Sequence, residues 1–356
     1  MEGIQINKFL GNESLSMVEA MQKIDINAKG ILFIVTEDNV LVGTVTDGDI
    51  RRAIIKTGNL DLCVRDIMNY TPQSVRQGEQ KNAYTLLEQL QLNAIPVIDS
   101  DGILQDIIFR ESVSSVSKEK ENILQGVPIV IMAGGKGTRL YPYTKILPKP
   151  LIPMGDIPIV ERIMERFNSY GSEIFYMTVN YRKNMIKSYL AEQTNYNITF
   201  IEEEKPLGTA GSLKMLSGKV KHPFFVTNCD ILINADYGEI YRYHIKTKNA
   251  VTIISALKSI EVPYGVIQSN GNGNVFALEE KPHLSYFINT GMYVLDPEYI
   301  EYIPENMFFH MTDLLEMLLN KRIQVGMYPI SEESFLDMGE WEELQRMEQK
   351  LKKTSD

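Results

Sequence analysis

Residues 129–153 constrain the fold of this chain more than any other stretch. The apolar run at 129–133 predicts a buried strand, which ends directly at the turn Gly134-Gly-Lys-Gly137. Glycines let the backbone turn tightly, and the N–H groups of such a loop form a concavity that binds anions. Cations follow in Arg139, whose planar fork suits phosphate, and in Lys149. The stretch therefore predicts a strand followed by a triphosphate site.

The run from Gly134 to Pro150 resembles the opening motif of the sugar-1-phosphate nucleotidyltransferase family, Gly-Gly-x-Gly-Thr-Arg-Leu-x-Pro-x-Thr-x-x-x-Pro-Lys-Pro, at every fixed position. It has neither the Walker spacing nor that of a dinucleotide fingerprint. The alternative from the glycines alone is a turn with solvated charges. The resemblance implies a catalytic pair, Arg139 and Lys149. It also implies a nucleotide-binding loop made of Ala133, Gly134, Gly135, Gly137 and Thr138.

Strands and helices alternate after this loop. The hydrophobic pattern predicts helices at 159–169 and 185–193 and strands at 173–180 and 198–202. Such alternation predicts an α/β domain whose ligands bind at the carboxyl ends of the strands. Together with the family resemblance, it leads us to expect a Rossmann-like domain with a mixed, mostly parallel sheet.

The segment Glu202-Glu-Glu-Lys-Pro-Leu-Gly-Thr-Ala occupies the place of the family's base-reading segment. The resemblance implies nucleotide contacts at Glu203, Gly208 and Thr209. Uridylyl and thymidylyl members tend to carry glutamine where this chain has Glu203. A carboxylate only accepts hydrogen bonds, and guanine presents two adjacent donors, so Glu203 favours GTP. The alternative is that Glu203 is one surface acid among three.

Two aspartates resemble the metal ligands of the family. Asp230 ends a predicted buried strand, where a carboxylate suits Mg²⁺ that bridges phosphates. Asp337 matches the first residue of the family pattern Asp-x-Gly-Thr-Pro, although Glu340-Trp341 replaces Thr-Pro. The resemblance implies that both aspartates hold Mg²⁺, and the departure predicts a different start for the following helix. The alternative for Asp230 is a turn-capping residue.

Three short segments, Pro-Tyr-Gly, Glu-Glu-Lys-Pro and Asn-Thr-Gly, resemble the sugar-phosphate pocket of the family in order and setting. An acid beside a base on a strand is otherwise common on protein surfaces. The resemblance implies that these segments let the backbone approach the sugar closely and accept hydrogen bonds from its hydroxyls. It also implies that they place a cation at the sugar phosphate and line the sugar ring. The residues concerned are Gly265, Glu280, Lys281, Asn289 and Thr290.

The first third of the chain contains a weak internal repeat of helix, strand, turn and strand, about sixty residues apart. Gly43-Thr-Val-Thr-Asp-Gly-Asp49 and Ala94-Ile-Pro-Val-Ile-Asp99 resemble a tandem pair of CBS domains, an α+β module. The family pattern implies that Thr46 and Asp49 hold the ribose of a regulatory adenine nucleotide. The alternative is that Asp49 caps a helix. The second copy lacks both residues, so we expect at most one site.

We expect a tandem CBS pair in residues 1–118, a polar linker in residues 119–126 and the transferase domain in residues 127–356. The 356 residues are 44% hydrophobic and 23% charged, which is typical of a globular chain of two or three domains. The net charge of −10 argues against a nucleic-acid partner. No apolar run approaches the ~20 residues that span a bilayer, so no membrane is expected.

The two cysteines, Cys63 and Cys229, form neither a metal spacing nor a disulfide framework. Residues 1–10 lack the apolar core of a secretory signal. These features predict a cytoplasmic protein. The four histidines form no cluster, so no zinc is expected. A homo-oligomer is expected.

The resemblances imply a Mg²⁺-dependent reaction of an NTP, preferably GTP, with a hexose 1-phosphate to give an NDP-sugar and pyrophosphate. CBS-fused members of this type resemble enzymes of nonulosonic (legionaminic) acid pathways, which favours glucosamine 1-phosphate and GDP-glucosamine. Mannose 1-phosphate, the substrate of mannose-1-phosphate guanylyltransferases, is the second candidate. Two other classes stay open: a nucleotide-sensing module without turnover, and a scaffold in which the CBS pair only assembles oligomers.

Overall fold

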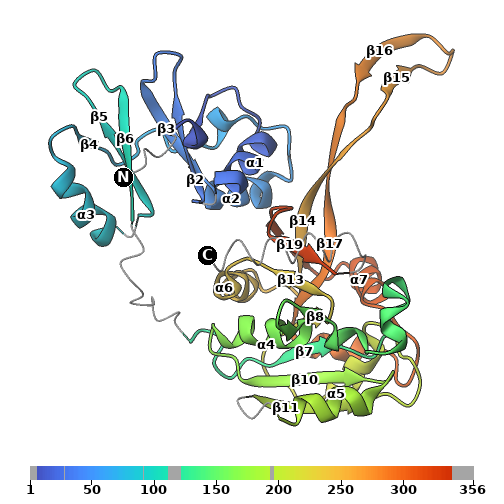
Figure 1. Ribbon diagram of the computed structural model, residues 1–356. Coiled ribbons are helices and arrows are strands. Elements are labelled where there is room, and N and C mark those ends of the chain that lie inside the picture. Colours follow the sequence, from blue (N-terminus) through green and yellow to red (C-terminus); the bar gives the residue numbers. More distant parts are fainter. Residues whose placement is uncertain (1–5, 28, 91, 111–121, 193–195, 339–356) are drawn as a thin grey trace. The chain divides into compact units, whose positions relative to one another are not determined.

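The computed structural model describes residues 6–27, 29–90, 92–110, 122–192 and 196–338 (Figure 1). Contacts divide the chain into two compact units, residues 1–117 with 260–285 and residues 118–259 with 286–356. The predicted domain ranges stay predictions, and residues 260–285 group with the first unit. The pair Glu340-Trp341, the predicted helix after it and residues 119–121 of the predicted linker lie outside the described residues.

The N-terminal part of the first unit contains two small sheets of the same topology. In each, a two-residue strand runs parallel to a central strand, which pairs antiparallel with a third. The strands are β1 (Leu10–Gly11), β2 (Ile31–Val35) and β3 (Leu41–Thr46), then β4 (Val75–Arg76), β5 (Ala94–Ile98) and β6 (Leu104–Phe109). The helices are α1 (Met17–Asn27), α2 (Asp47–Thr57) and α3 (Gln80–Gln89). Phe33 and Ile107 pack in one core that both sheets share. The structure thus agrees with the predicted repeat.

The second unit is built on a seven-stranded sheet with the order β11-β10-β7-β12-β17-β14-β18. Its strands are β7 (Ile129–Met132), β10 (Ile174–Val179), β11 (Asn197–Glu202), β12 (Phe224–Asn228), β14 (Val251–Glu261), β17 (His283–Leu295) and β18 (Val325–Ile330). β10 and β12 flank β7 in parallel, β11 is parallel to β10, and β17 pairs antiparallel with β12. The predicted mixed, mostly parallel sheet is confirmed.

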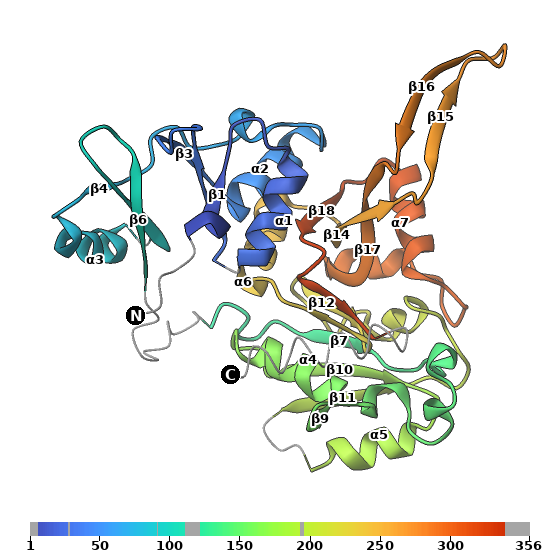
Figure 2. The same cartoon turned by 45° about the horizontal axis from the view of Figure 1, so that its top comes forward.

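Helices cover both faces of this sheet (Figure 2). The covering helices are α4 (Ile159–Asn168), α5 (Lys183–Leu190) and α6 (Tyr237–Thr247) on one face, and η6 (Gly211–Leu216), η7 (Pro297–Tyr302) and α7 (Met311–Asn320) on the other. Side chains of β7 alternate between them, with Ile129 and Ile131 in the first core and Val130 and Met132 in the second. Burial on both faces explains why this strand is an unbroken apolar run.

The remaining elements are short. They are the strands β8 (Pro153–Met154), β9 (Ile157–Pro158), β13 (Ile231–Ile233), β15 (Gly265–Ser269), β16 (Val275–Glu280) and β19 (Phe335–Asp337), and the 3₁₀ turns η1 (Ile6–Phe9), η2 (Val64–Asp66), η3 (Thr138–Leu140), η4 (Tyr143–Lys145) and η5 (Lys149–Leu151). β13 pairs antiparallel with β19, which is about a hundred residues later in the chain. None of the helices in the described ranges is long and apolar enough to cross a membrane.

Candidate active site

The glycine loop leaves the central strand β7 at the edge where the parallel strands β10 and β12 also end. The N–H of Ala133 donates to the carbonyl of Thr178 at 3.0 Å and so extends the ladder by one residue. Because these strands are parallel, the residues after each of them meet at one edge. The loop and Asp230, which follows β12, are therefore brought together by the sheet.

Gly137 is required by both the shape and the packing of the loop. Its φ is +66°, and a Cβ there would lie 2.9 Å from Cγ2 of Thr144 and 3.1 Å from Cβ of Lys149. The hydroxyl of Thr144 donates to the carbonyl of Gly137 at 3.0 Å. A Cβ on Gly135 would meet nothing within 4 Å. The loop is thus closed against the Pro-Lys-Pro segment and open at Gly135, where a ligand has access to the backbone.

Lys149 and Asp230 form an ion pair that is almost withdrawn from solvent, with the two residues 8% and 7% exposed. Arg139 lies beside the same carboxylate, with Nη2 3.8 Å from Oδ2 of Asp230, but its side chain is 61% exposed. Taking a charge out of water is costly unless it is paired. The structure therefore joins both predicted catalytic cations to one predicted metal ligand.

Asp337 lies next to Asp230 through the pairing of β13 with β19. It is directly opposite Ile231, and the N–H of Met338 donates to the carbonyl of Asp230 at 2.8 Å. The described residues contain no group of three or more acidic, histidine or cysteine side chains that could hold a metal. Two carboxylates nevertheless fit Mg²⁺, which usually takes one or two protein carboxylates and completes its shell with water and substrate phosphates.

Glu203 is not the surface acid that the sequence left open, because it is 5% exposed while Glu202 and Glu204 are exposed. Its carboxylate oxygens lie 3.1 and 3.2 Å from the position that a Cβ on Gly134 would take. The N–H of Leu207 donates to Oε2 at 3.3 Å. Burial raises the pKa of Glu203, and the Leu207 N–H opposes that rise. This acceptor therefore lies against the glycine loop.

The Gly208-Thr209 segment is held by a residue that the sequence did not indicate, His310. The N–H of Thr209 points to Nδ1 of His310 at 3.4 Å, and the Thr209 hydroxyl accepts from the N–H of Met311 at 3.0 Å. A Cβ on Gly208 would lie 2.5 Å from the carbonyl oxygen of Phe309. The partners are about a hundred residues apart, so no local pattern could have paired them.

The profile of the family described as nucleotidyl transferase matches residues 129–354. The chain belongs to the nucleotidyl transferase family. The CBS domain profile matches residues 12–56 of this nucleotidyl transferase. The predicted family and the N-terminal CBS domain are confirmed.

Three similar proteins illustrate the relationship. A mannose-1-phosphate guanyltransferase of Yarrowia lipolytica is 35% identical over 184 residues, which are 49% of this chain and 50% of that protein. A UTP–glucose-1-phosphate uridylyltransferase of Synechocystis sp. is 32% identical over 197 residues, 49% and 50% of the two chains. The nucleotidyl transferase thus spans about half the length of these curated relatives. The crystal structure of HddC from Yersinia pseudotuberculosis superposes with a TM-score of 0.51 at 25% identity, covering 63% of this chain and 99% of that one.

The residues predicted for the sugar phosphate divide between the two units of the nucleotidyl transferase. In the second unit, the Thr290 hydroxyl is buried and donates to the carbonyl of Ile254 at 2.7 Å. The Asn289 amide donates to the Tyr293 hydroxyl at 2.8 Å. Both side chains thus have protein partners, and their sugar contacts stay predictions.

The other three sugar-phosphate residues lie in the hairpin of β15 and β16. Gly265 is directly opposite Glu280, whose Oε2 would lie 2.9 Å from a Cβ on that glycine. Lys281 follows with a φ of +49°. All three are exposed. The structure therefore groups these residues at one end of the hairpin.

Thr46 and Asp49 form a capping box at the start of α2. The Thr46 hydroxyl donates to Oδ2 of Asp49 at 2.6 Å and accepts from the Asp49 N–H at 3.2 Å. Arg52 pairs with the other carboxylate oxygen at 2.5 Å. The helix-capping alternative is thus present in the structure, and the nucleotide contact stays a prediction.

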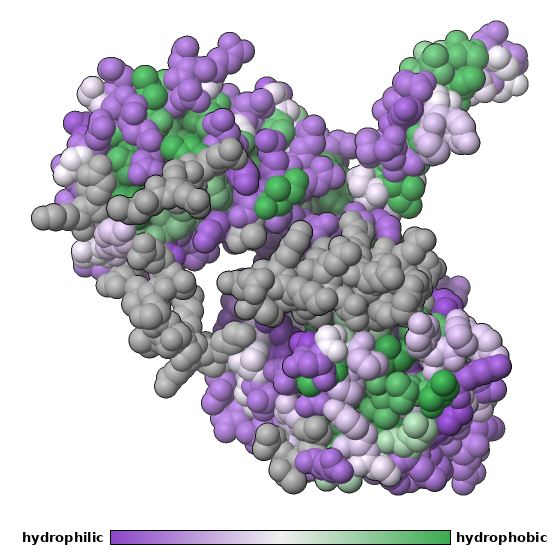
Figure 3. All heavy atoms as spheres, viewed as in Figure 1, coloured by the Kyte–Doolittle hydropathy of each residue, from purple (hydrophilic) through white to green (hydrophobic). Residues whose placement is uncertain are grey.

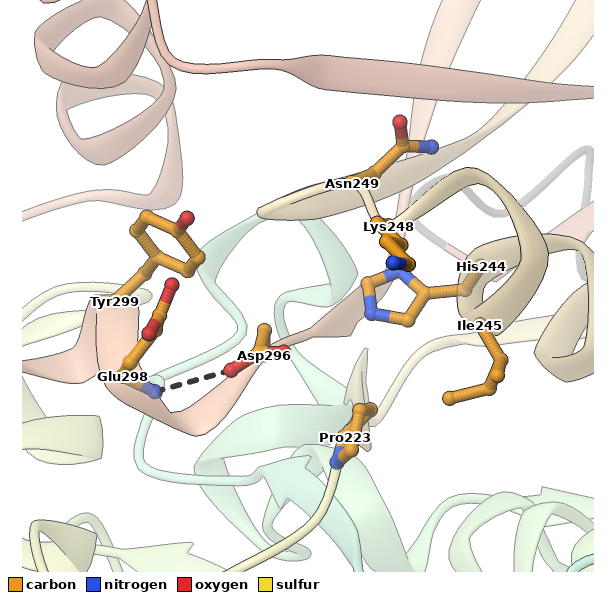
Figure 4. A pocket seen from close by; sticks show the side chains of 8 residues that line it. All are labelled: Pro223, His244, Ile245, Lys248, Asn249, Asp296, Glu298 and Tyr299. Atoms are coloured by element: carbon orange, nitrogen blue, oxygen red, sulfur yellow. Dashed lines mark hydrogen bonds between the residues drawn. The ribbon is translucent and has the colours of Figure 1, made fainter.

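A separate pocket of the second unit contains none of the predicted site residues. It is lined by Pro223, His244, Ile245, Lys248, Asn249, Asp296, Glu298 and Tyr299 (Figure 4). Pro223 directly precedes β12, so the pocket lies at the opposite edge of the sheet from the glycine loop. Burial lowers the pKa of His244 to about 4, and its Nδ1 lies 2.8 Å from the Thr252 hydroxyl.

Proposed function

We propose that this nucleotidyl transferase transfers a nucleotidyl group from an NTP to a hexose 1-phosphate and releases pyrophosphate. The observation that carries the proposal is the meeting of the glycine loop, Lys149, Arg139 and Asp230 at one edge of the sheet. Phosphoryl and nucleotidyl transfer need little from a protein besides positioning and charge stabilisation. The names of the relatives, mannose-1-phosphate guanyltransferase and UTP–glucose-1-phosphate uridylyltransferase, support this substrate class.

In the proposed reaction, a phosphate oxygen of the sugar phosphate attacks the α-phosphorus of the NTP. The bond to the bridging oxygen breaks, and pyrophosphate leaves with the electron pair. The attacking phosphate is already ionised near neutral pH, so no general base is required. Loop N–H groups and Arg139 would bind the triphosphate, Lys149 would offset charge on the leaving group, and Lys281 would orient the sugar phosphate. Mg²⁺ held by Asp230 and Asp337 would neutralise charge on the substrate phosphates.

We infer that GTP is the preferred nucleotide, and Glu203 supports this choice. Its carboxylate is buried against Gly134 and, when ionised, has acceptors only. A buried acceptor pair suits the adjacent N1–H and N2–H₂ donors of guanine and leaves uracil, with one donor beside acceptors, poorly matched. The guanyltransferase relatives point the same way.

The sugar has two candidates. Mannose 1-phosphate is favoured by the names of the relatives, and glucosamine 1-phosphate by the fusion to a CBS module. Release of pyrophosphate, measured with Mg²⁺ across four NTPs and the 1-phosphates of glucosamine, mannose and glucose, tests base and sugar together. A UTP-selective signal would contradict the guanine preference. Absence of turnover with every pair would favour the nucleotide-sensing module.

The CBS pair is the proposed regulatory part. Thr46 and Asp49 would hold the ribose of an adenine nucleotide by exchanging part of their capping box for ribose hydroxyls. Equilibrium dialysis of the full chain with ATP, ADP and AMP tests this, with Asp49→Asn as the variant. Unchanged retention of adenine nucleotide by the variant would refute the assignment.

A further inference from the structure

The pocket at the opposite edge of the sheet from the glycine loop has a lining that the proposed reaction does not use. It lies within the second unit, between the end of α6 and the start of η7 (Figure 4). Apolar side chains gather on the hairpin of β15 and β16 (Figure 3), whereas most side chains that line this pocket are polar or charged. The volume is about 230 Å³, below the roughly 300–1,000 Å³ of pockets for drug-sized ligands. The pocket therefore suits a small polar molecule.

A chain of hydrogen bonds behind the pocket determines which nitrogen of His244 carries the proton. The Gln324 amide donates to Oδ1 of Asn249 at 2.8 Å, and the Asn249 amide donates to the Thr252 hydroxyl at 3.0 Å. That hydroxyl lies 2.8 Å from Nδ1 of His244. If Nδ1 donated to it, the hydroxyl proton of the fully buried Thr252 would need another acceptor, and none is found among the described residues. The neutral imidazole therefore accepts at Nδ1 and carries its proton on Nε2.

The Nε2–H of His244 is a donor aimed into the pocket. Figure 4 shows the imidazole projecting from α6 with Nε2 turned towards the open space between α6 and η7. His244 is 1% exposed, and no residue in the described ranges accepts a hydrogen bond from Nε2. A buried donor without an acceptor is costly to the folded protein. An acceptor group of a ligand at this place would remove that cost.

Charges lie on two sides of the same pocket. Lys248, directly after α6, contributes a cation on the side of His244, while Asp296 and Glu298 at the start of η7 contribute carboxylates on the other side (Figure 4). Asp296 accepts from the N–H of Glu298 at 3.3 Å and so holds the start of η7. As far as the structure describes the chain, no ion pair joins Lys248 to either carboxylate. The two sides thus present opposite charges to whatever lies between them.

We propose that this pocket binds a small zwitterion, namely a free amino acid. Its carboxylate would accept from the Nε2–H of His244 and pair with the ammonium of Lys248. Its own ammonium would donate to the carboxylate of Glu298, on the side where Asp296 adds negative charge. A carboxylate has acceptors only and an ammonium donors only, so each end of the ligand matches one side of the pocket and is mismatched to the other.

The proposal is independent of the proposed nucleotidyl transfer. No residue that lines the pocket belongs to the group around the glycine loop, and the two sites lie at opposite edges of the sheet. Turnover therefore does not require that the pocket is occupied, and binding of the amino acid does not require an active transferase. Binding is the quantity to measure.

Ligand-observed NMR titrations of the full chain test the proposal. The probes are glycine, serine, β-alanine and γ-aminobutyrate, which differ in size and in the separation of their two charges. We expect at least one of them to bind saturably, and acetate and methylammonium, which carry one charge each, to bind at least about tenfold more weakly. Absence of binding by all four amino acids, or equal binding of either single-charge compound, would overturn the proposal.

Variants locate the binding. Lys248→Gln and Glu298→Gln each remove one charge from an exposed side chain of the lining, so the fold should be kept and the affinity should fall at least about tenfold. Lys246→Gln is the matched control, because Lys246 is exposed on α6 and does not line the pocket. Circular dichroism checks folding. Wild-type affinity in both pocket variants, or an equal loss of affinity in the control, would contradict the assignment of the pocket.

The imidazole gives a second readout. In protein labelled with ¹⁵N-histidine, the signal of His244 is identified by its loss in His244→Gln. Wild type without amino acid should show Nδ1 unprotonated and Nε2 protonated, and saturation with the amino acid should shift the Nε2 signal. A proton on Nδ1, or an Nε2 signal that stays unchanged at saturation, would refute the contact with His244.

Discussion

Lys149 and Asp230 share a buried ion pair although 81 residues separate them in the chain. The pair links the Pro-Lys-Pro segment after the glycine loop to the end of β12. The arrangement has a structural consequence besides any catalytic one. Removing one partner leaves the other as a nearly buried, uncompensated charge.

We therefore predict that Lys149→Ala lowers the free energy of unfolding by about 3 kcal/mol or more, because Asp230 then remains buried without its main cation. The double variant Lys149→Ala/Asp230→Ala should lose less than the sum of the two single changes. Urea denaturation followed by circular dichroism measures both. Additive losses would show that the pair has no coupling energy.

Asp230→Asn and Asp337→Asn should each reduce pyrophosphate release by more than about 100-fold, since the metal contributes several kcal/mol to charge stabilisation. Asp296→Asn, in the pocket at the opposite edge of the sheet, is the matched control and should keep activity. Isothermal titration with Mn²⁺ gives a readout without turnover, and Asp230→Asn should lose the binding. Full Mg²⁺-dependent activity of either site variant would refute the assignment of that aspartate.

Glu203→Gln should reduce the GTP:UTP ratio of kcat/KM at least about tenfold, because an amide presents a donor where guanine requires an acceptor. Glu202→Gln is the control, since Glu202 is exposed and pairs with Lys183 and Lys187. The measurement is pyrophosphate release with the two nucleotides in parallel. An unchanged GTP:UTP ratio in Glu203→Gln would refute the base-reading role of Glu203.

His310→Ala should raise the KM for the NTP several-fold with a smaller change in kcat. Loss of the imidazole removes the acceptor that holds the N–H of Thr209, so the Gly208-Thr209 segment loses its position. His310→Asn, which offers a carbonyl oxygen, should restore part of the affinity. Equal KM values for all three proteins would show that His310 does not position the loop.

The lowered pKa of His244 predicts that the free energy of unfolding depends on pH. The folded protein keeps it neutral down to about pH 4, whereas the unfolded chain binds the proton near pH 6.5. The contribution of the neutral His244 to the free energy of unfolding is therefore complete above pH 6.5. It is lost as the pH falls towards 4, by up to about 3 kcal/mol. The difference in unfolding free energy between wild type and His244→Gln, measured by denaturant titration from pH 7 to pH 4, should shrink accordingly. A constant difference would contradict this origin.

Much of the fold could be predicted from local sequence patterns. The apolar run of β7 and the glycine motif after it are contiguous, so Gly137 at positive φ and the parallel sheet could be predicted from residues that are neighbours in sequence. Local patterns could not decide the role of Thr46 and Asp49. Their spacing of three residues fits a helix cap, which the structure has, and it also fits the family pattern of a ribose site.

By itself, the sequence determined which residue types stand at the ends of strands, because alternation and periodicity are local properties of the chain. The tertiary structure decided which of these residues meet. The burial of Glu203 against Gly134, the contact of Thr209 with His310 and the position of Asp337 beside Asp230 all join segments far apart in the chain. Such contacts depend on strand order and register, which arise when the whole core packs, and no short pattern encodes them.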